Sequence, residues 1–97
     1  MFNKLKNFKE LRDQAKQMQS MLSTETAEGS GAWGKVKVTI NGNQEILTVL
    51  IDPEILTNQE KTQDAVKEAV NDAIKKIQRT IAMKMQQSGM GLNFPGM

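Results

Sequence analysis

The sequence predicts an α+β fold in which two long helices flank two or three antiparallel strands. Apolar residues recur at helical spacing in residues 8–22 and again in residues 66–85, and between them apolar and polar residues alternate along residues 35–40. Steps of three and four residues place side chains on one face of a helix, whereas alternation places them on one face of a strand. The length of 97 residues suits a single domain.

The first helix is predicted to cover about residues 3–22. Its apolar side chains follow one another in steps of three and four residues, as in a heptad seam. They are Phe8, Leu11, Ala15, Met18 and Leu22. The other faces carry Lys, Arg, Gln and Asn, so we expect the seam to be buried against another element.

The segment between this helix and the clearest strand is polar and fits two interpretations. Residues 23–28 are compatible with a polar edge strand or with a simple linker, and Gly29-Ser30-Gly31 is predicted to be a turn. We expect Trp33, beside that turn, to act as a hydrophobic cap rather than as a platform that stacks on a base.

Two strands joined by a hairpin are predicted next. Residues 35–40 form the first, and Asn41-Gly42 is a strong hairpin signal. The return strand, residues 45–51, is apolar on both faces. The chain's own helices can cover one face, so we expect a second subunit to cover the other, with Ile46 and Leu50 in the dimer interface.

The second helix is predicted after Asp52-Pro53, because proline cannot continue the ladder of the return strand. A capping box from Thr57 to Glu60 is expected to begin it, and Gly89 is expected to end it. Its apolar stripe comprises Val66, Val70, Ala73, Ile74, Ile77, Ile81 and Met85. We expect one domain over residues 1–88 and a flexible tail over residues 89–97.

Charge is segregated along the chain. The net charge of +2 is the balance of +3 in residues 1–16, −5 in residues 17–74 and +4 in residues 75–97. A helix of about 28 residues spans ~42 Å and a strand of seven only ~23 Å, so the second helix must extend past the sheet. The first helix enters the sheet by its C-terminus and the second leaves by its N-terminus. We therefore expect both basic ends to meet at one distal tip, packed side by side as a projecting arm.

The basic side chains of these two ends are the candidate DNA-contacting residues. Clustered positive charges repel one another, and a polyanion relieves that repulsion. Lysine and arginine on phosphates give salt-dependent binding with little sequence information. The candidates are Lys4, Lys6, Lys9, Arg12, Lys16, Lys75, Lys76, Arg79 and Lys84.

The composition argues against catalysis and metal binding. The chain has no His and no Cys, which removes the commonest general base, the thiol nucleophile and the best transition-metal ligands. Four acids at four-residue spacing fit a solvated helix face better than a carboxylate metal site, which normally includes His. These acids are Glu60, Asp64, Glu68 and Asp72. We expect no enzyme activity, no cofactor, no metal and no small-molecule substrate.

The sequence also predicts a cytoplasmic location. No apolar run approaches the roughly 20 residues of a membrane span, so we expect no membrane partner. The first residues carry lysine too early for the apolar region of a signal peptide.

Several short motifs follow one another along the chain. They are Gln17-Met18-Gln19, Val36-Lys37-Val38-Thr39-Ile40-Asn41-Gly42, Ile51-Asp52-Pro53 with Leu56, Asn71-Asp72-Ala73, Lys75-Lys76-Ile77 and a Gly/Met-rich tail. Their order and spacing resemble the YbaB/EbfC family of bacterial nucleoid-associated proteins, over nearly the whole chain. The resemblance implies an α-β-β-β-α fold, a homodimer with projecting helical arms like tweezers, and DNA binding with little sequence preference. It also implies a place in the nucleoid, with roles in nucleoid organisation and gene expression.

The main interpretation is a homodimer that binds duplex DNA. The competing interpretation is a protein–protein adaptor. Methionine-rich surfaces adapt to varied partners, and several such side chains lie near the expected tips. They are Phe2, Met83, Met85 and Met90. An RNA-binding module would use the same basic residues, but nothing on the strands predicts an aromatic platform for bases.

Overall fold

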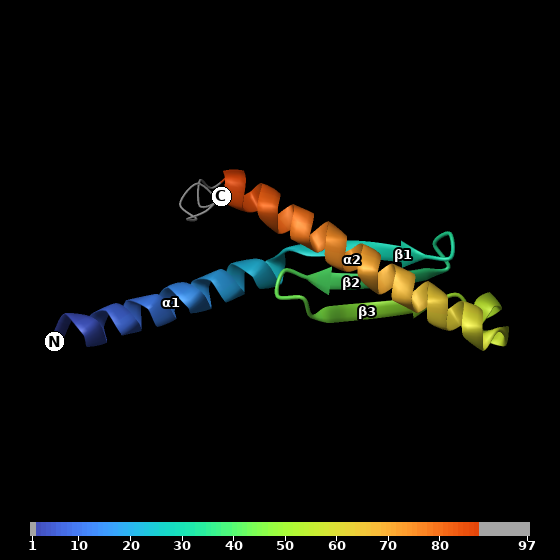
Figure 1. Ribbon diagram of the computed structural model, residues 1–97, viewed down its shortest axis with the longest axis horizontal. Helices are drawn as coiled ribbons and strands as arrows, with labels where there is room; N and C mark the ends of the chain where they lie inside the picture. Colours follow the sequence, from blue (N-terminus) through green and yellow to red (C-terminus); the bar gives the residue numbers. More distant parts are fainter. Residues whose placement is uncertain (1, 88–97) are drawn as a thin grey trace.

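The protein is an antiparallel three-stranded sheet between two long helices (Figure 1). This computed structural model describes the backbone of residues 2–87 and the side chains of residues 8–87. The elements are α1 (Phe2–Thr24), β1 (Thr26–Gly31), β2 (Val36–Asn41), β3 (Ile46–Ile51), a short 3-10 helix η1 (Pro53–Thr57) and α2 (Gln59–Gln87). The strands lie in the order β1-β2-β3. The predicted α+β class and α-β-β-β-α order are confirmed.

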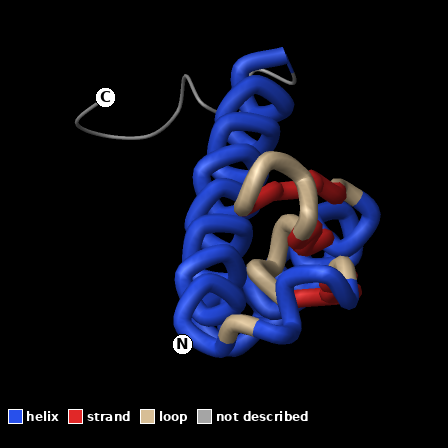
Figure 2. The backbone as a smooth tube through the Cα atoms, turned by 90° about the vertical axis from the view of Figure 1, so that its right-hand side faces the viewer, coloured by secondary structure: helices blue, strands red, loops and turns tan. Residues whose placement is uncertain are grey.

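The core lies between α2 and one face of the sheet. Ala65, Ala69, Ala73 and Ile77 of α2 are buried against alternate residues of β2, namely Val36, Val38 and Ile40. The alanines let the helix approach β1 and β2 closely, and Figure 2 shows α2 along one side of the strands. The predicted stripe is only partly buried at Val66, Val70 and Ile74. The helix is therefore rotated so that its smallest residues face the sheet.

Gly29-Ser30-Gly31 lies in β1, so the predicted turn at this position is wrong. A Cβ on Gly29 would lie 2.2 Å from the carbonyl oxygen of Ala69, and one on Gly31 would lie 2.2 Å from that of Ala65. Glycine is required here because the backbones of β1 and α2 touch. The turn instead follows β1, where Ala32, Trp33 and Gly34 have φ values of 52°, 61° and 88°. Of the two interpretations of the preceding segment, the edge strand is correct, displaced toward the C-terminus.

The hairpin predicted at Asn41-Gly42 is confirmed, and it also holds the end of α1. Asn41 is buried, and its Oδ1 accepts hydrogen bonds from the N–H groups of Asn43 and Glu45, both at 3.0 Å. The N–H of Gly42 lies 2.9 Å from the carbonyl oxygens of Leu22 and Glu25. These bonds join the C-terminus of α1 to the β2–β3 loop.

The start of α2 differs from the predicted capping box. Asn58 caps the helix, since its Oδ1 accepts a hydrogen bond from the N–H of Lys61 at 3.0 Å. Thr57 is the last residue of η1, and its Oγ1 donates to the carbonyl oxygen of Glu54 instead. Asp52 caps η1 by accepting from the N–H of Glu54 at 2.9 Å. The short helix η1 therefore separates β3 from α2, and η1 and α2 each have their own N-terminal cap.

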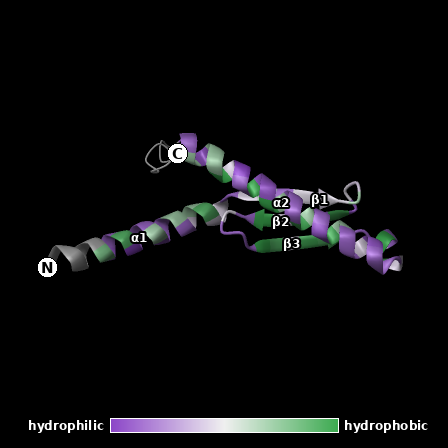
Figure 3. Ribbon diagram, in the orientation of Figure 1, coloured by the Kyte–Doolittle hydropathy of each residue, from purple (hydrophilic) through white to green (hydrophobic). Residues whose placement is uncertain are grey.

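β3 is an edge strand that α2 leaves uncovered. Ile46, Leu47, Val49 and Leu50 are 44%, 50%, 47% and 62% exposed. Val38 pairs with Val49 and Lys37 with Leu50, so apolar side chains stand on both faces of the strand. Figure 3 shows β3 as hydrophobic along its length. Within residues 2–87, no helix is both long enough and apolar enough to cross a bilayer.

Candidate nucleic-acid interface

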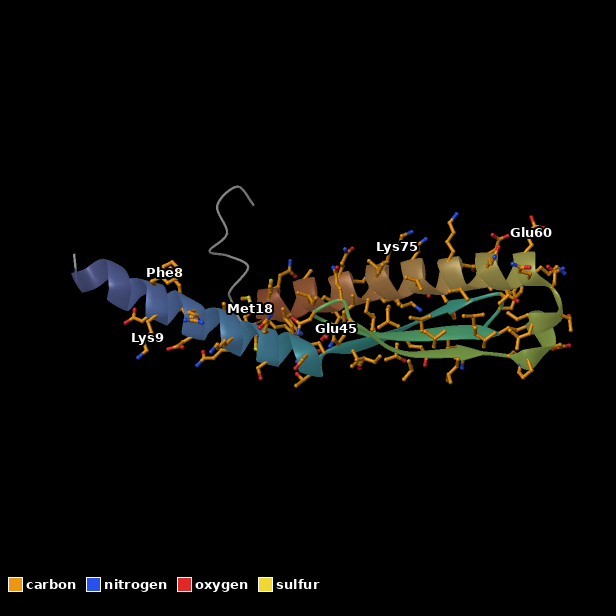
Figure 4. All side chains as sticks on the ribbon, turned by 90° about the horizontal axis from the view of Figure 1, so that it is seen from below. Phe8, Lys9, Met18, Glu45, Glu60 and Lys75 are labelled. Atoms are coloured by element: carbon orange, nitrogen blue, oxygen red, sulfur yellow. The ribbon has the colours of Figure 1, made fainter. Side chains whose placement is uncertain are left out.

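α1 extends away from the sheet and carries one group of the candidate basic residues. Lys9, Arg12 and Lys16 are exposed, and their spacing of three and four residues places them on one side of the helix. Figure 4 shows Lys9 on the part of α1 that projects beyond α2. We call these three residues the α1 basic face. The side chains of Lys4 and Lys6 lie outside the described residues.

α2 carries a second group, here called the α2 basic face, which comprises Lys75, Lys76 and Arg79. Lys75 lies two residues before the buried Ile77, which is half a helical turn away, so it points away from the sheet (Figure 4). Arg79 lies one turn further along and is exposed. No carboxylate among the described residues forms an ion pair with Lys75 or Arg79.

Lys76 is partly neutralised by Asp72. Its Nζ lies 3.0 Å from Asp72 Oδ2, and the same oxygen accepts a hydrogen bond from the N–H of Ser30 at 3.0 Å. The Ser30 N–H, together with Lys76, holds the pKa of Asp72 below its ordinary value. Asp72 therefore joins α2 to β1, a role that its predicted place on a solvated helix face did not include. The four-residue spacing from Asp72 to Lys76 was the available signal for the ion pair.

Lys84 has a structural partner that was not predicted from the sequence. Its Nζ lies 3.2 Å from Oε1 of Glu25, the residue between α1 and β1. This ion pair joins the C-terminal end of α2 to the junction of α1 with the sheet. The two residues are 59 positions apart in the chain, so no local pattern predicts their contact.

The two basic faces do not meet at one tip, which corrects the expected placement of the basic ends. Ile77, between Lys75 and Arg79, is fully buried in the core, so the α2 basic face lies over the sheet. α1 and α2 approach each other where Met18, Met21 and Leu22 line a cavity together with Ile81 and Met85. N-terminal to that point α1 continues past the end of α2 (Figures 1 and 4). The lengths of α1 and α2 set how far each helix extends, but the angle between the two helices separates the α1 basic face from the α2 basic face.

Large apolar side chains remain uncovered on β3 and on α1. The predicted dimer residues Ile46 and Leu50 are exposed on β3, and so are Leu47 and Val49. The apolar seam of α1 was expected to be buried, yet Phe8 and Leu11 are 72% and 63% exposed. Because the helix leaves the sheet, nothing in the described part of this chain covers those two residues.

Trp33 is fully exposed at the β1–β2 turn, so the expected hydrophobic cap is wrong. Its φ of 61° is one of the positive values that form this turn. The acids predicted to form a solvated face, Glu60, Asp64 and Glu68, are exposed on α2. In the described residues, no group of three or more His, Cys, Asp or Glu side chains has the geometry to hold a metal ion.

Comparison with known proteins identifies the family. The sequence model of the YbaB/EbfC DNA-binding family matches residues 1–92. The chain belongs to this family. The family is described as DNA-binding, and the resemblance inferred from the motifs is confirmed.

Two bacterial relatives support the assignment. A protein of Syntrophobacter fumaroxidans named as a nucleoid-associated protein is 38% identical over 98 residues, covering 99% of this chain and 89% of the relative. A protein of Caldanaerobacter subterraneus, also named as a nucleoid-associated protein, is 33% identical over 97 residues. The match covers 98% of this chain and 87% of that relative. An uncharacterised protein of Helicobacter pylori has a similar crystal structure, with a TM-score of 0.64 at 20% identity over 89% of this chain and 95% of that one. That likeness supports the fold.

Proposed function

We propose that this protein binds duplex DNA as a homodimer, largely without sequence preference, through phosphate contacts of its two basic faces. It acts in the nucleoid, where it affects nucleoid organisation and gene expression, and it has no enzymatic activity. The observation that carries the proposal is the exposure of Lys75 and Arg79 on the outer side of α2, where neither forms an ion pair with a carboxylate of the described residues, in a member of a DNA-binding family.

Phosphate contact accounts for the kind of recognition proposed. The α1 and α2 basic faces consist of lysine and arginine on helix surfaces, and such side chains bind the DNA backbone rather than base edges. Because the two basic faces are separated, we expect each to contact a different stretch of the DNA backbone, rather than both to bind DNA at a single tip. A dimer that engages roughly 4–8 phosphates has a slope of log K against log salt of about −4 to −7.

The homodimer is proposed on the uncovered β3. An edge strand presents unpaired backbone N–H and C=O groups, and an apolar one is a template for pairing with another chain. The apolar side chains of β3 stand on both faces, so a second copy would bury them while pairing the backbone. We assign Ile46 and Leu50 to this interface.

The test is DNA binding by matched charge variants over a range of salt concentrations. The variant Lys75→Gln with Arg79→Gln removes two positive charges from the outer side of α2. The control, Lys61→Gln with Lys67→Gln, removes two exposed positive charges from the acidic half of the same helix. We expect the first variant to bind more weakly, with a slope reduced by about 0.9 for each phosphate that it no longer neutralises. Equal binding by the two variants would refute the proposal.

A protein–protein adaptor is the second candidate, and the exposure of Phe8 and Leu11 on the projecting part of α1 favours it. An adaptor needs apolar side chains at its contact surface, whereas phosphate binding does not. DNA association that is weak and insensitive to salt, together with full binding by the Lys75 and Arg79 variant, would favour the adaptor.

A further inference from the structure

We propose that Phe8 of α1 docks into a pocket at the opposite end of a second copy of this chain. The inference goes beyond DNA binding, and the contact does not use the proposed β3 interface. Figure 4 shows Phe8 on the projecting part of α1 and Glu60, at the start of α2, at the other end of the molecule. The pocket lies at the Glu60 end, so one chain cannot fill its own pocket with its own Phe8.

The pocket lies between the β1–β2 turn and the first turns of α2, and its volume is about 370 Å³. Ala32, Ile55 and Ala65 give it apolar walls, and the fully exposed Trp33 belongs to its lining. Benzene binds in an apolar cavity of about 150 Å³, so this pocket has room for a phenyl ring and part of a neighbouring side chain. The pocket therefore fits an aromatic side chain.

The charged side chains at the pocket favour a basic partner. Lys35 is already paired with Glu54, since its Nζ lies 3.1 Å from Oε2 of that residue. Asp64 and Glu68 then outnumber Lys61 in the lining, and both acids are exposed. Neither of these carboxylates forms an ion pair with a residue that the structure describes. A positive side chain beside the docked ring would therefore gain a partner.

The projecting part of α1 carries the complementary groups. Phe8 and Leu11 are 72% and 63% exposed. Arg12 follows Phe8 by four residues, so the two side chains are neighbours on the helix surface. Asp64 and Glu68 have the same spacing on α2, so an α1 laid on that helix places Phe8 in the pocket and Arg12 against a carboxylate. Tryptophan and arginine are the residue types that most often dominate the binding energy of protein interfaces.

The contact joins two different surfaces, which lie at opposite ends of the long axis of the molecule (Figure 1). Such a heterologous contact can repeat from one copy to the next, and together with pairing at β3 it would join dimers end to end. One aromatic side chain and one ion pair make a small contact, so it forms at higher protein concentration than the β3 dimer. It uses Arg12 and leaves Lys9 and Lys16 of the α1 basic face available to phosphates.

Sedimentation in the absence of DNA tests the contact. As its concentration is raised, the wild type should pass twice the 10.8 kDa mass of one chain, and less so at high salt because the ion pair is screened. Phe8→Ser and Trp33→Ser should each abolish growth past the mass of two chains. Met83→Ser is the control, because it removes a 55% exposed apolar side chain outside the pocket lining. Absence of growth in the wild type, or equal growth by Phe8→Ser, would overturn the proposal.

Charge reversal tests whether the two surfaces belong to different copies. Arg12→Glu changes only the α1 side of the contact, and Asp64→Lys with Glu68→Lys changes only the pocket side. Each protein alone should lose the growth past two chains. An equal mixture should regain it, because the unchanged α1 of one protein fits the unchanged pocket of the other. A mixture that stays at the mass of two chains or less would reject a contact between these surfaces.

The fluorescence of Trp33 gives a readout that leaves the pocket unaltered, because this residue is the only tryptophan of the chain. Docking of Phe8 from a second copy shields the indole from water. We therefore expect the emission to move to shorter wavelength as the concentration of the wild type rises, and to stay constant in Phe8→Ser. A shift that occurs only on addition of duplex DNA would reject the proposal and assign Trp33 to contact with bases.

Discussion

The carboxylate of Asp72 accepts a hydrogen bond from the backbone N–H of Ser30, and this bond connects the middle of α2 to β1. It lies beside the close approach of Gly29 to Ala69 and Ala73, so the polar contact and the tightest backbone contact occur at the same crossing. Asp72 also holds Lys76, which belongs to the α2 basic face. The residue thus fixes the helix on the sheet and limits the free positive charge on its surface.

The stability of the protein is expected to fall in acid through Asp72. The pKa of Asp72 is below its ordinary value in the folded state, because the Ser30 N–H and Lys76 favour the carboxylate. Its stabilisation is therefore present above the unfolded pKa of about 3.9 and is lost as the pH falls through the folded pKa. Urea unfolding from neutral pH to about pH 2 will measure this loss.

The variant Asp72→Asn isolates that contribution. We expect it to be less stable than the wild type at neutral pH and to lose less stability on acidification. Asp64→Asn, at an exposed position two turns earlier on the same helix, is the control and should retain the wild-type profile. Identical profiles for wild type and Asp72→Asn would show that the hydrogen bond and ion pair of Asp72 do not contribute.

Gly29→Ala is expected to destabilise the fold. The added Cβ would lie 2.2 Å from the carbonyl oxygen of Ala69 and from the N–H nitrogen of Ala73, so β1 and α2 must separate. Overpacking of this kind costs about 1–3 kcal/mol. Thermal or urea unfolding measures the cost, and Ser30→Ala, which keeps the backbone N–H, is the control. A variant as stable as the wild type would mean that the helix moves away at no cost in stability.

Leu50→Glu is expected to prevent dimerisation. The glutamate would place a charge on the exposed apolar surface of β3, where a second copy is proposed to pack. Leu56→Glu is the matched control, because Leu56 on η1 is 57% exposed and Leu50 is 62% exposed. Sedimentation should give the mass of one chain, 10.8 kDa, for Leu50→Glu, and twice that for the control and the wild type. A Leu50→Glu protein that remains a dimer places the interface elsewhere.

Lys84 and Arg79 are expected to differ in their effect on DNA binding. Lys84 is paired with Glu25, whereas Arg79 has no ion pair within residues 8–87. Arg79→Gln should reduce the slope of log K against log salt by about 0.9, because one phosphate fewer is neutralised. Lys84→Gln should leave that slope unchanged and cost about 1 kcal/mol of stability, as for an ion pair at the protein surface. Equal slopes for the two variants would reject this distinction.

Periodicity was sufficient to predict the main elements. The α1 seam, the alternation in β2, the apolar β3 and the α2 stripe all depend on the repeat of local geometry, which a sequence displays directly. Local turn chemistry was less reliable. Gly29 and Gly31 have the turn propensity of any glycine, but in the fold α2 lies too close to them for a side chain. The contacts are between Gly29 and Ala69, 40 positions apart in the chain, and between Gly31 and Ala65, 34 positions apart.

The candidate basic residues were identified from composition, but not their arrangement. The sequence showed that both ends are basic, and the family comparison supports DNA as the partner. The sequence did not show that Lys84 pairs with Glu25, or that the two basic faces are separated. Those outcomes depend on how far α2 overlies the sheet and on the direction in which α1 leaves it.

The amino-acid sequence by itself determined which segments are helices and strands, which residues carry charge, and the absence of the side chains on which most catalysis and metal binding depend. Tertiary structure alone decided which apolar side chains stay uncovered, which lysines are neutralised, and where the positive surfaces lie. The physical reason is that hydrogen bonding and side-chain periodicity act over a few residues. The angles and distances between elements arise instead from packing among residues far apart in the chain.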